Sequence, residues 1–312
     1  MNADYDLVIV GGGAAGMGAA QYGARANLRA LVIEEMAHGG QALLIDKLEN
    51  YPGLLPVVDG YTWSENMRTQ AEEFGAEMRS SSVSAIRKEG DIMFVETTDG
   101  TISAKAVIVA TGAKHRHAEV KGEEEFSGRG VSYCATCDGP FFKGKPMVVV
   151  GGGDAACDEA MYLSKLTDKI VMVHRKDRFR AQKALADRVL NNPKIEMRWE
   201  TVIEEIKGEK SVNTVALRNL KTGEISEVVA AAVFIFVGSI PQTSAVPQDV
   251  ARDEAGSIVT NERMETSLPG LFAVGDVRTT PFRQVVTAVA DGAVAAHCAA
   301  QYIDELEGHA YK

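Results

Sequence analysis

The feature that most constrains the fold of this chain is a pattern that occurs twice: strand, glycine turn, helix, strand. The first copy begins with the apolar run Asp6–Val10, passes through the turn Gly11–Gly16 and the helical pattern Met17–Ala26, and ends in the apolar run Ala30–Ile33. A strand that enters a helix through a glycine-rich turn and then returns to a second strand is typical of a dinucleotide-binding unit.

The second copy has the same order and the same length. Its segments are Pro146–Val150, Gly151–Ala156, Cys157–Leu166 and Lys169–Val173. Each copy is also followed by a later apolar strand, Ala106–Gly112 in the first and Ala232–Gly238 in the second. The repeat therefore predicts an α/β fold with two Rossmann-like, three-layer dinucleotide-binding domains. A long amphipathic helix over Gln284–Leu306 is expected near the end of the chain.

The glycines of the first turn have distinct physical roles. Gly11 permits the tight turn, Gly13 allows the backbone to approach a pyrophosphate, and Gly16 allows close packing of helix on strand. The phosphates then lie at a helix N-terminus, where free N–H groups favour anions. Glu34 ends the second strand and can accept hydrogen bonds from a ribose. The alternative is a glycine-rich turn that binds nothing.

The second turn differs at two positions. Ala156 replaces the third glycine, and the strand ends in His174, Arg175 and Lys176 rather than in an acid, with Arg180 close behind. Cations attract a 2′-phosphate, and arginine can bind it with two parallel hydrogen bonds. The second nucleotide is therefore expected to be NADP(H) rather than NAD(H). The alternative is a solvated basic patch.

The third motif is Cys134-Ala-Thr-Cys137-Asp138. Two residues between cysteines suit a reversible disulfide at a turn or helix start. A zinc site would need two more ligands at close spacing, whereas Cys157 and Cys298 are distant and are expected to serve in packing. An inert pair is the other alternative. Asp138 is a candidate general acid–base, or else a helix cap.

Composition excludes several other classes of protein. The net charge of −10 argues against general binding of nucleic acid. The longest apolar run, Val228–Val237, is too short for a membrane span and is expected to form one buried strand. No targeting signal is evident, so a cytoplasmic location is expected. No histidine grouping suggests a metal. Surface positions are expected for His38, His115, His117, His297 and His309.

The chain resembles the low-molecular-weight thioredoxin reductases over nearly its whole length. The residues that carry the resemblance are Gly11–Gly16, Gly39–Gln41, Glu49–Gly53, Ala110–Gly112, Cys134–Asp138, Gly151–Ala156, His174–Arg180, Gly275–Asp276 and Arg283–Gln284. The Cys-Ala-Thr-Cys-Asp-Gly stretch between two nucleotide motifs is the most specific of these.

The resemblance implies a domain order and a set of cofactor-binding residues. FAD would bind a discontinuous domain, residues 1–115 and 245–312, and NADPH an inserted domain, residues 116–244, that also carries the dithiol. The implied FAD-binding residues are Gly11, Gly13, Ala14, Ala15, Gly16, Glu34, Glu35, Gly40, Gln41, Asn50, Ala110, Thr111, Gly112, Gly275, Asp276, Arg283, Gln284 and Val285. The implied NADPH-binding residues are Gly151, Gly153, Asp154, Ala155, Ala156, His174, Arg175, Lys176 and Arg180.

The resemblance also implies the reaction. Electrons would pass from NADPH to FAD, then to the Cys134–Cys137 disulfide, and then to thioredoxin. Cys137 would lie nearest the flavin, Cys134 would attack the partner's disulfide, and Asp138 would be the acid–base. A homodimer is expected, with no nucleic-acid or membrane partner. Two alternatives are a flavin-dependent dithiol oxidase of the same fold and a non-catalytic NADP(H)-binding sensor. The first should lack the cations around Arg175, and the second has no need of a redox dithiol.

Overall fold

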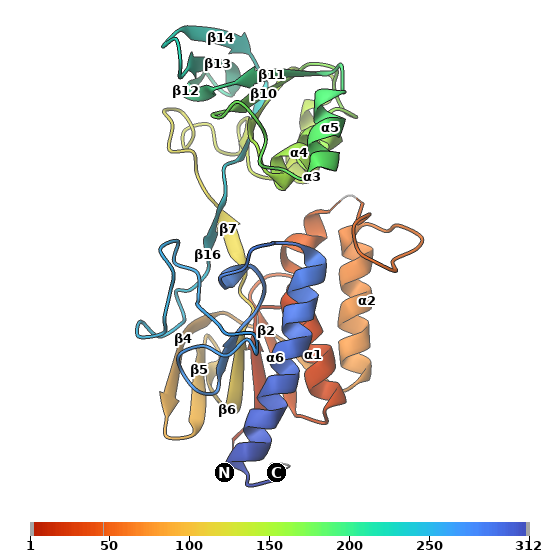
Figure 1. The fold of residues 1–312 in the computed structure, drawn as a ribbon, viewed down its shortest axis with the longest axis vertical. Helices are drawn as coiled ribbons and strands as arrows, with labels where there is room; N and C mark the ends of the chain where they lie inside the picture. Colours follow the sequence, from red (N-terminus) through yellow and green to blue (C-terminus); the bar gives the residue numbers. More distant parts are fainter. Residues whose placement is uncertain (1–2, 46, 310–312) are drawn as a thin grey trace. The chain divides into compact units, whose positions relative to one another are not determined.

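The computed structural model describes residues 3–45 and 47–309 and divides the chain into two compact units (Figure 1). The discontinuous unit comprises Met1–Lys114 and Ile240–Lys312, and the inserted unit comprises His115–Ser239. Between them the chain crosses twice, and strands β7 (Ala113–His115) and β16 (Ser239–Pro241) of these crossings pair with each other.

The discontinuous unit is built on a largely parallel sheet. Its strands run β3-β2-β1-β6-β5-β4, with β17 also pairing with β6. The bounds are β1 (Tyr5–Val10), β2 (Ala30–Glu34), β3 (Glu77–Ser80), β4 (Val83–Glu89), β5 (Ile92–Thr97), β6 (Gly100–Val109) and β17 (Leu271–Ala273). Strand β5 pairs antiparallel with both β4 and β6, so β6 links the parallel sheet to a β-meander. Helices α1 (Ala14–Arg25), α2 (Gly60–Glu73) and α6 (Val285–Leu306) pack side by side (Figure 1).

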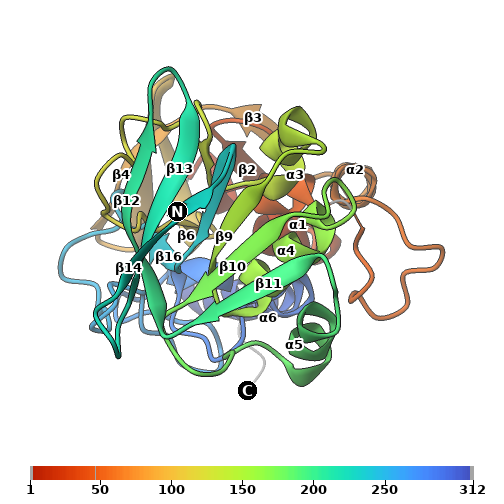
Figure 2. The ribbon, with the colours of Figure 1, turned by 90° about the horizontal axis from the view of Figure 1, so that it is seen from above.

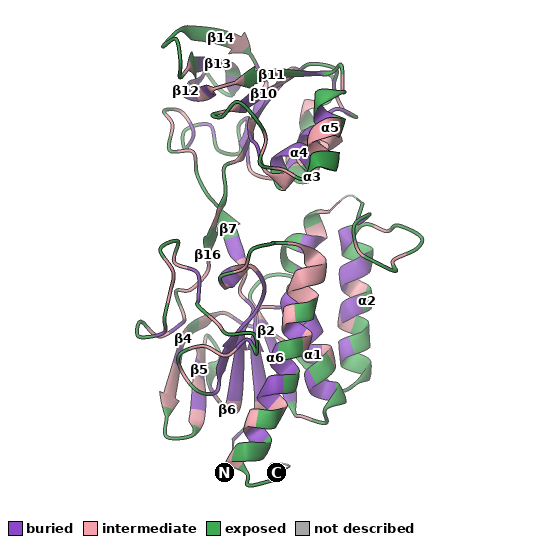
Figure 3. Cartoon of the chain, viewed as in Figure 1, coloured by how far each residue is buried: buried purple, intermediate pink, exposed green. Residues whose placement is uncertain are grey.

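The side chains of β1 show why the sequence folds into three layers. Leu7 and Ile9 lie in the core beneath the helices, whereas Val8 and Val10 lie in the core on the other face of the sheet. Successive side chains of a strand point to opposite faces, so a strand covered on both faces must be apolar throughout. Figure 3 shows the resulting buried centre of the sheet.

The inserted unit repeats this plan. Its parallel sheet has the order β11-β10-β9-β15-β8, in which the first four strands correspond to β3-β2-β1-β6 of the other unit. Figure 2 shows β9, β10 and β11 side by side. The bounds are β8 (Val131–Ser132), β9 (Met147–Gly151), β10 (Ile170–His174), β11 (Ile195–Trp199) and β15 (Ala232–Phe236). An antiparallel sheet holds β12 (Thr201–Gly208), β13 (Val212–Asn219) and β14 (Ile225–Val229), and the helices are α3 (Ala135–Asp138), α4 (Asp154–Leu163) and α5 (Lys183–Leu190). The predicted α/β class and the strand–turn–helix–strand repeat are confirmed.

Some predicted boundaries are wrong. The apolar run Val228–Val237 is not one strand, because β14 ends at Val229 and β15 begins at Ala232. Two alanines separate the strands, and alanine gives no turn signal. Both glycine-turn helices also begin three residues earlier than predicted, at Ala14 and Asp154, because the turn supplies the first helical residues itself.

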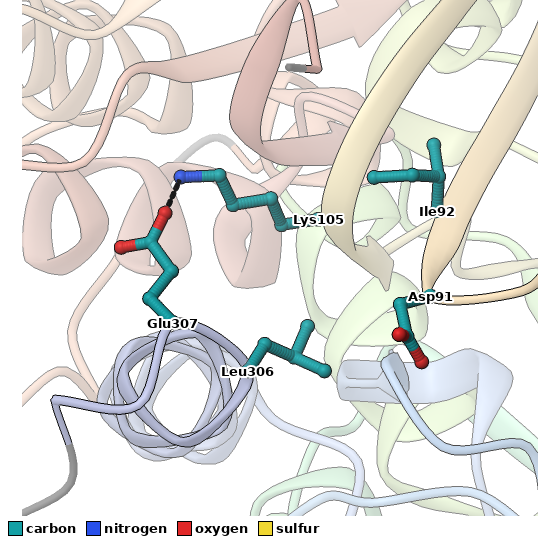
Figure 4. A pocket seen from close by; sticks show the side chains of 5 residues that line it. All are labelled: Asp91, Ile92, Lys105, Leu306 and Glu307. Carbon is teal, nitrogen blue, oxygen red and sulfur yellow. Dashed lines mark hydrogen bonds and ion pairs between the residues drawn. The ribbon is translucent and has the colours of Figure 1, made fainter. Parts of the chain in front are cut away.

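Ion pairs connect the C-terminal end of α6 to the sheet. Lys105 on β6 pairs with Glu307 and, at 2.7 Å, with Asp6 on β1. A cavity of about 360 Å³ lies beside this cluster. It is lined by Asp91, Ile92, Lys105, Leu306 and Glu307 (Figure 4). Within the described residues, no helix is long and apolar enough to cross a membrane, and no group of side chains could hold a metal ion.

Candidate active site

The first glycine turn has room for nothing but glycine at two positions. Gly11 has a φ of +107°, and a Cβ there would lie 2.4 Å from the carbonyl oxygen of Ala110. A Cβ on Gly16 would lie 1.9 Å from the Gly11 oxygen, so α1 packs directly on the end of β1. Gly13 is the N-cap of α1 and supplies no side-chain cap. The N-terminus of α1 is thus open to an anion such as a phosphate.

Glu34 is fixed beside this turn. Its carboxylate accepts the N–H of Gly12 at 2.7 Å and that of Met36 at 3.0 Å. His38 also lies here, since a Cβ on Gly12 would be 2.7 Å from its Nδ1. That nitrogen is buried without a hydrogen-bond partner among the described residues, although the residue is half-buried as a whole, so the expected surface position of His38 is only partly correct. A lone histidine in a loop gave no signal of this contact.

The C-terminal part of the chain completes the site around α1. Gly275 opens the short helix η3 (Gly275–Val277), and a Cβ there would lie 3.0 Å from the Cβ of Ala15. Its N–H donates to Asp291 of α6 at 3.1 Å, and Arg278 pairs with the same carboxylate at 3.0 Å. Asp291 and Arg278 were missed by the sequence reasoning, because their partners are distant in the chain.

Asp276 is half-buried on η3. Burial raises the pKa of its carboxyl, Arg283 opposes this shift, and Asp291 adds to it. A half-buried acid at the start of a short helix is suited to bind a hydroxyl or N–H group of a ligand.

Within the discontinuous unit, hydrogen bonds join polar side chains to segments that are distant in the sequence. Asn50 donates a hydrogen bond from Nδ2 to Oε1 of Gln284 at 2.8 Å, although 234 positions separate them. Gln284 also caps α6 reciprocally with Thr287, just before Val285 begins the helix. Gln41 donates to the carbonyl of Ala113, and Thr111 donates to that of Gln242 at 2.6 Å. The tight turn, the open helix end, the half-buried acid and these amides together suit a flavin dinucleotide.

The second glycine turn repeats the first with one difference. A Cβ on Gly151 would lie 2.5 Å from the oxygen of Phe236 and 2.6 Å from the Cβ of Ala156. Ala156 is buried and fits in place of a third glycine. Gly153 is the N-cap of α4 and, like Gly13, offers no side-chain cap. The carboxylate of Asp154 instead binds Gln182, at 2.8 Å to its N–H and 2.7 Å to Nε2.

The cation-bearing loop folds back onto this turn. The N–H groups of Arg180 and Ala181 donate to the Gly152 oxygen at 2.7 and 3.1 Å. Arg180 Nη2 lies 3.6 Å from where a Cβ of Gly153 would be, so its guanidinium is beside the open end of α4. Arg175 and Lys176 are exposed on the same loop. Arg178, which the sequence reasoning passed over, is a further exposed cation of this loop.

His174 packs against the residues of this loop and does not add a positive charge to it. Its ring lies 2.3–2.6 Å from where a Cβ of Gly152 would be, and it packs near Phe179 and Trp199. Burial and the neighbouring cations lower its pKa, so the ring is neutral at pH 7.

The dithiol lies just after β8 in the same inserted unit. Cys134 and Cys137 form a disulfide with their Cα atoms 5.4 Å apart. Cys134 is the N-cap of α3, as the helix-start prediction required, and its Sγ accepts the N–H of Cys137 at 3.2 Å. Thr136 Oγ1 lies 3.4 Å from the same sulfur. Cys137 is exposed and Cys134 half-buried.

The rest of this turn is anchored in the core. Ala135 is fully buried, and a Cβ on Gly139 would lie 2.8 Å from Leu163 Cδ2 of α4. The other two cysteines, Cys157 and Cys298, are buried, which confirms their predicted role in packing. Burial, together with neighbouring acids, raises the pKa of Cys157 to about 12, so it is no nucleophile.

Comparison with known proteins decides the family. The family described as Pyridine nucleotide-disulphide oxidoreductase matches residues 5–292. The chain is 55% identical over 307 residues to the thioredoxin reductase of Treponema pallidum, covering 98% of this chain and 100% of the relative. The chain belongs to the thioredoxin reductases of the pyridine nucleotide-disulphide oxidoreductase family. It is thus a flavoprotein oxidoreductase whose cofactors are FAD and NADPH.

Other thioredoxin reductases support this assignment. The one from Peptoclostridium acidaminophilum is 43% identical, over 96% of this chain and 97% of its own length. Among solved structures, the Lactococcus lactis thioredoxin reductase (FR conformation) gives a TM-score of 0.94 at 43% identity, covering 97% of this chain and 100% of that one. The T. acidophilum thioredoxin reductase gives 0.91 at 36% identity, covering 98% and 100%. The two predicted Rossmann-like domains are confirmed by these likenesses.

Proposed function

We propose that the Cys134–Cys137 pair is the group through which this enzyme reduces thioredoxin. When bound, the flavin takes up hydride from NADPH and can pass two electrons to a disulfide. The observation that carries the proposal is the disulfide itself, which lies in the same unit as the cation-bearing glycine turn. The two cysteines differ in environment, since Cys137 is an exposed residue and Cys134 is half-buried with its sulfur hydrogen-bonded.

Each unit holds one cofactor in this proposal. In the discontinuous unit, the turn Gly11–Gly16 binds the FAD pyrophosphate, Glu34 the ribose, and Asp276 with Gln284 the flavin. In the inserted unit, the turn Gly151–Ala156 binds the NADPH pyrophosphate, and Arg175, Lys176 and Arg180 bind the 2′-phosphate. The remaining predicted cofactor residues flank these groups.

The chemistry of the dithiol follows from thiol–disulfide exchange. The Cys134 thiolate attacks one sulfur of the thioredoxin disulfide, and the other sulfur leaves as a thiolate. The Cys137 thiolate then attacks Cys134 Sγ, which re-forms the Cys134–Cys137 disulfide and releases the second thioredoxin thiolate. The N–H of Cys137 and the hydroxyl of Thr136 lie at Cys134 Sγ, where they can stabilise its negative charge. Asp138 is the proposed acid–base, which protonates the departing thiolate.

One dithiol must serve both the flavin and a bulky protein partner, so we expect the inserted unit to reorient during turnover. Its two connections to the rest of the chain, at Lys114–His115 and Ser239–Ile240, are suited to a hinge. We also propose that the enzyme is a homodimer. A cytoplasmic location is proposed because two of its four cysteines are buried free thiols, so the chain has no structural disulfide framework.

The test is an anaerobic assay with thioredoxin from the source organism. NADPH should bleach the flavin absorbance of the wild-type protein, and oxidised thioredoxin should restore it with two thiols formed per NADPH. Cys134→Ser and Cys137→Ser should each bind FAD and still be bleached, but neither should form thioredoxin thiols. A dithiol oxidase would not bleach with NADPH, and a sensor would form no thiols. Near-normal turnover in either serine variant would contradict the proposal.

A further inference from the structure

Tyr133 directly precedes Cys134, and its hydroxyl is the centre of a network that the proposed function leaves unused. The hydroxyl lies 2.6 Å from Glu123 Oε1 and 2.7 Å from His117 Nδ1. The histidine nitrogen is 3.4 Å from the same carboxylate oxygen. All three residues belong to the inserted unit, and none is part of a glycine turn or of the dithiol.

Glu123 is the fixed end of the network. Its side chain is 4% exposed, and its carboxylate also accepts the N–H groups of Ala118 at 2.9 Å and Val120 at 3.3 Å. Burial alone would raise the pKa of Glu123, but the hydrogen bonds from Tyr133 and these N–H groups outweigh burial and lower it. Glu123 is therefore ionised at neutral pH and can only accept hydrogen bonds.

The direction of every hydrogen bond follows from this charge. Burial and the adjacent carboxylate raise the pKa of Tyr133, so the phenol keeps its hydrogen and donates it to Glu123. The phenol oxygen is then left as an acceptor, so Nδ1 of His117 must carry a hydrogen and donate it. The network runs from His117 to Tyr133 to Glu123, with each donor matched to an acceptor.

The network and Ser132 together fix the backbone around Cys134. Ser132 Oγ, which is buried, accepts the N–H of Cys134 and donates to its carbonyl, both at 3.1 Å. On the next residue, the Tyr133 ring stacks with His115 at 6.4 Å between centroids and meets His117 edge-on at 4.9 Å. The segment His115–Glu123, with which the inserted unit begins, is thus bonded to the residue before Cys134.

We propose that Tyr133 and Glu123 are positioning residues for Cys134, which hold its sulfur in the geometry that thiol–disulfide exchange requires. This inference rests on the proposed role of the dithiol. Exchange needs the attacking sulfur in line with the disulfide, and small displacements of a reacting atom cost large factors in rate. His117 completes the network from the segment near the first crossing between the units.

The first test is Tyr133→Phe, which keeps the ring and removes only the hydroxyl. The rate of flavin bleaching by NADPH and the FAD content should be unchanged, whereas kcat/KM for thioredoxin should fall about tenfold. Glu123→Gln should give a loss of the same kind. The double variant should be no slower than the worse single variant, because both changes break one network. Tyr61→Phe, at an exposed tyrosine of α2, is the matched control and should be silent in both steps.

His117 provides a second variant on the surface, where folding is not at risk. His117→Gln can still donate to the phenol oxygen and should retain most activity, whereas His117→Leu cannot and should be slower. Wild-type exchange rates in Tyr133→Phe, losses that add in the double variant, or equal slowing of the bleaching step would each overturn the inference. Turnover that survived in Cys134→Ser would instead contradict the proposed function, so the two failures are distinct.

Discussion

Asn50 and Gln284 meet through a 2.8 Å hydrogen bond between their side-chain amides, although one precedes α2 and the other caps α6. The bond joins the N-terminal and C-terminal parts of the discontinuous unit, on either side of the inserted unit in the sequence. This unit is thus tied across the insertion by the same residues that are proposed to line the flavin.

Asn50→Ala and Gln284→Ala should therefore weaken FAD binding. Each change removes one side of this bond and a polar group proposed to face the flavin, so the dissociation constant should rise about fivefold, since one hydrogen bond contributes about 1 kcal/mol. Fluorescence titration of the apoprotein with FAD measures it. Asn213→Ala, at an exposed asparagine of β13, is the control. An unchanged FAD affinity in both variants would remove this pair from the site.

Removal of the two loop arginines should erode the preference for NADPH. Arg175→Ala together with Arg180→Ala deletes both guanidinium groups proposed to bind the 2′-phosphate. The ratio of kcat/KM for NADPH over NADH should fall at least about tenfold. Arg218→Ala, on the surface strand β13 and paired with Glu204, should leave the ratio unchanged. Equal use of NADH and NADPH by the wild-type enzyme would contradict the assignment.

The third glycine position of the two turns should differ in its tolerance of alanine, since Gly16 occupies it in the first turn and Ala156 in the second. At the second turn Ala156 is tolerated, but a Cβ on Gly16 would lie 1.9 Å from a backbone oxygen that cannot move aside freely. Gly16→Ala should thus be isolated with little FAD and a lower melting temperature. Gly23→Ala in the same helix meets only the tip of Leu7 and should keep its FAD. A yellow, fully loaded Gly16→Ala protein would show that the turn is not the pyrophosphate site.

The Asp6–Lys105 ion pair should make the free energy of unfolding depend on pH in the acidic range. Burial would raise the pKa of Asp6, but hydrogen bonds from Lys105 and Arg29 outweigh it and lower the pKa to about 2, from 3.8. The ionised form thus stabilises the fold above about pH 4, and the contribution is lost as the pH falls toward 2. Asp6→Asn should lower the free energy of unfolding by about 2 kcal/mol at pH 7. Urea unfolding at pH 7 and at pH 3 should show the difference shrinking, with exposed Asp99→Asn as control.

Most of the architecture could be predicted because its signals are local. An apolar strand, a glycine turn and a helix follow each other within one stretch of chain, and the two copies reinforce each other. The Cys134–Cys137 spacing likewise placed a reversible disulfide at a helix start, which the structure confirms. The run Val228–Val237 was misread because its break between strands contains only alanines, which fit a strand as well as a turn.

The contacts that could not be predicted are long-range. Nothing in the spacing of Asp291 or Arg278 indicates that they hold Gly275, because the partners meet only after α6 packs beside α1. The contact of His38 is similar, because its buried Nδ1 reaches Gly12 only once the chain has folded back beside the first turn. The Tyr133 network joins residues whose individual patterns are ordinary, and only their distances reveal it.

The central claim is that electrons leave this enzyme through Cys134. The most direct measurement uses Cys137→Ser, which can attack the partner but cannot resolve the product. Reduced Cys137→Ser should be mixed with thioredoxin activated as a mixed disulfide at its own cysteine, and the products analysed by intact mass and peptide mapping. The account predicts a covalent one-to-one adduct through Cys134 Sγ that dithiothreitol releases, and much less adduct with Cys134→Ser. A dominant adduct through Cys137 in Cys134→Ser, with none in Cys137→Ser, would contradict it.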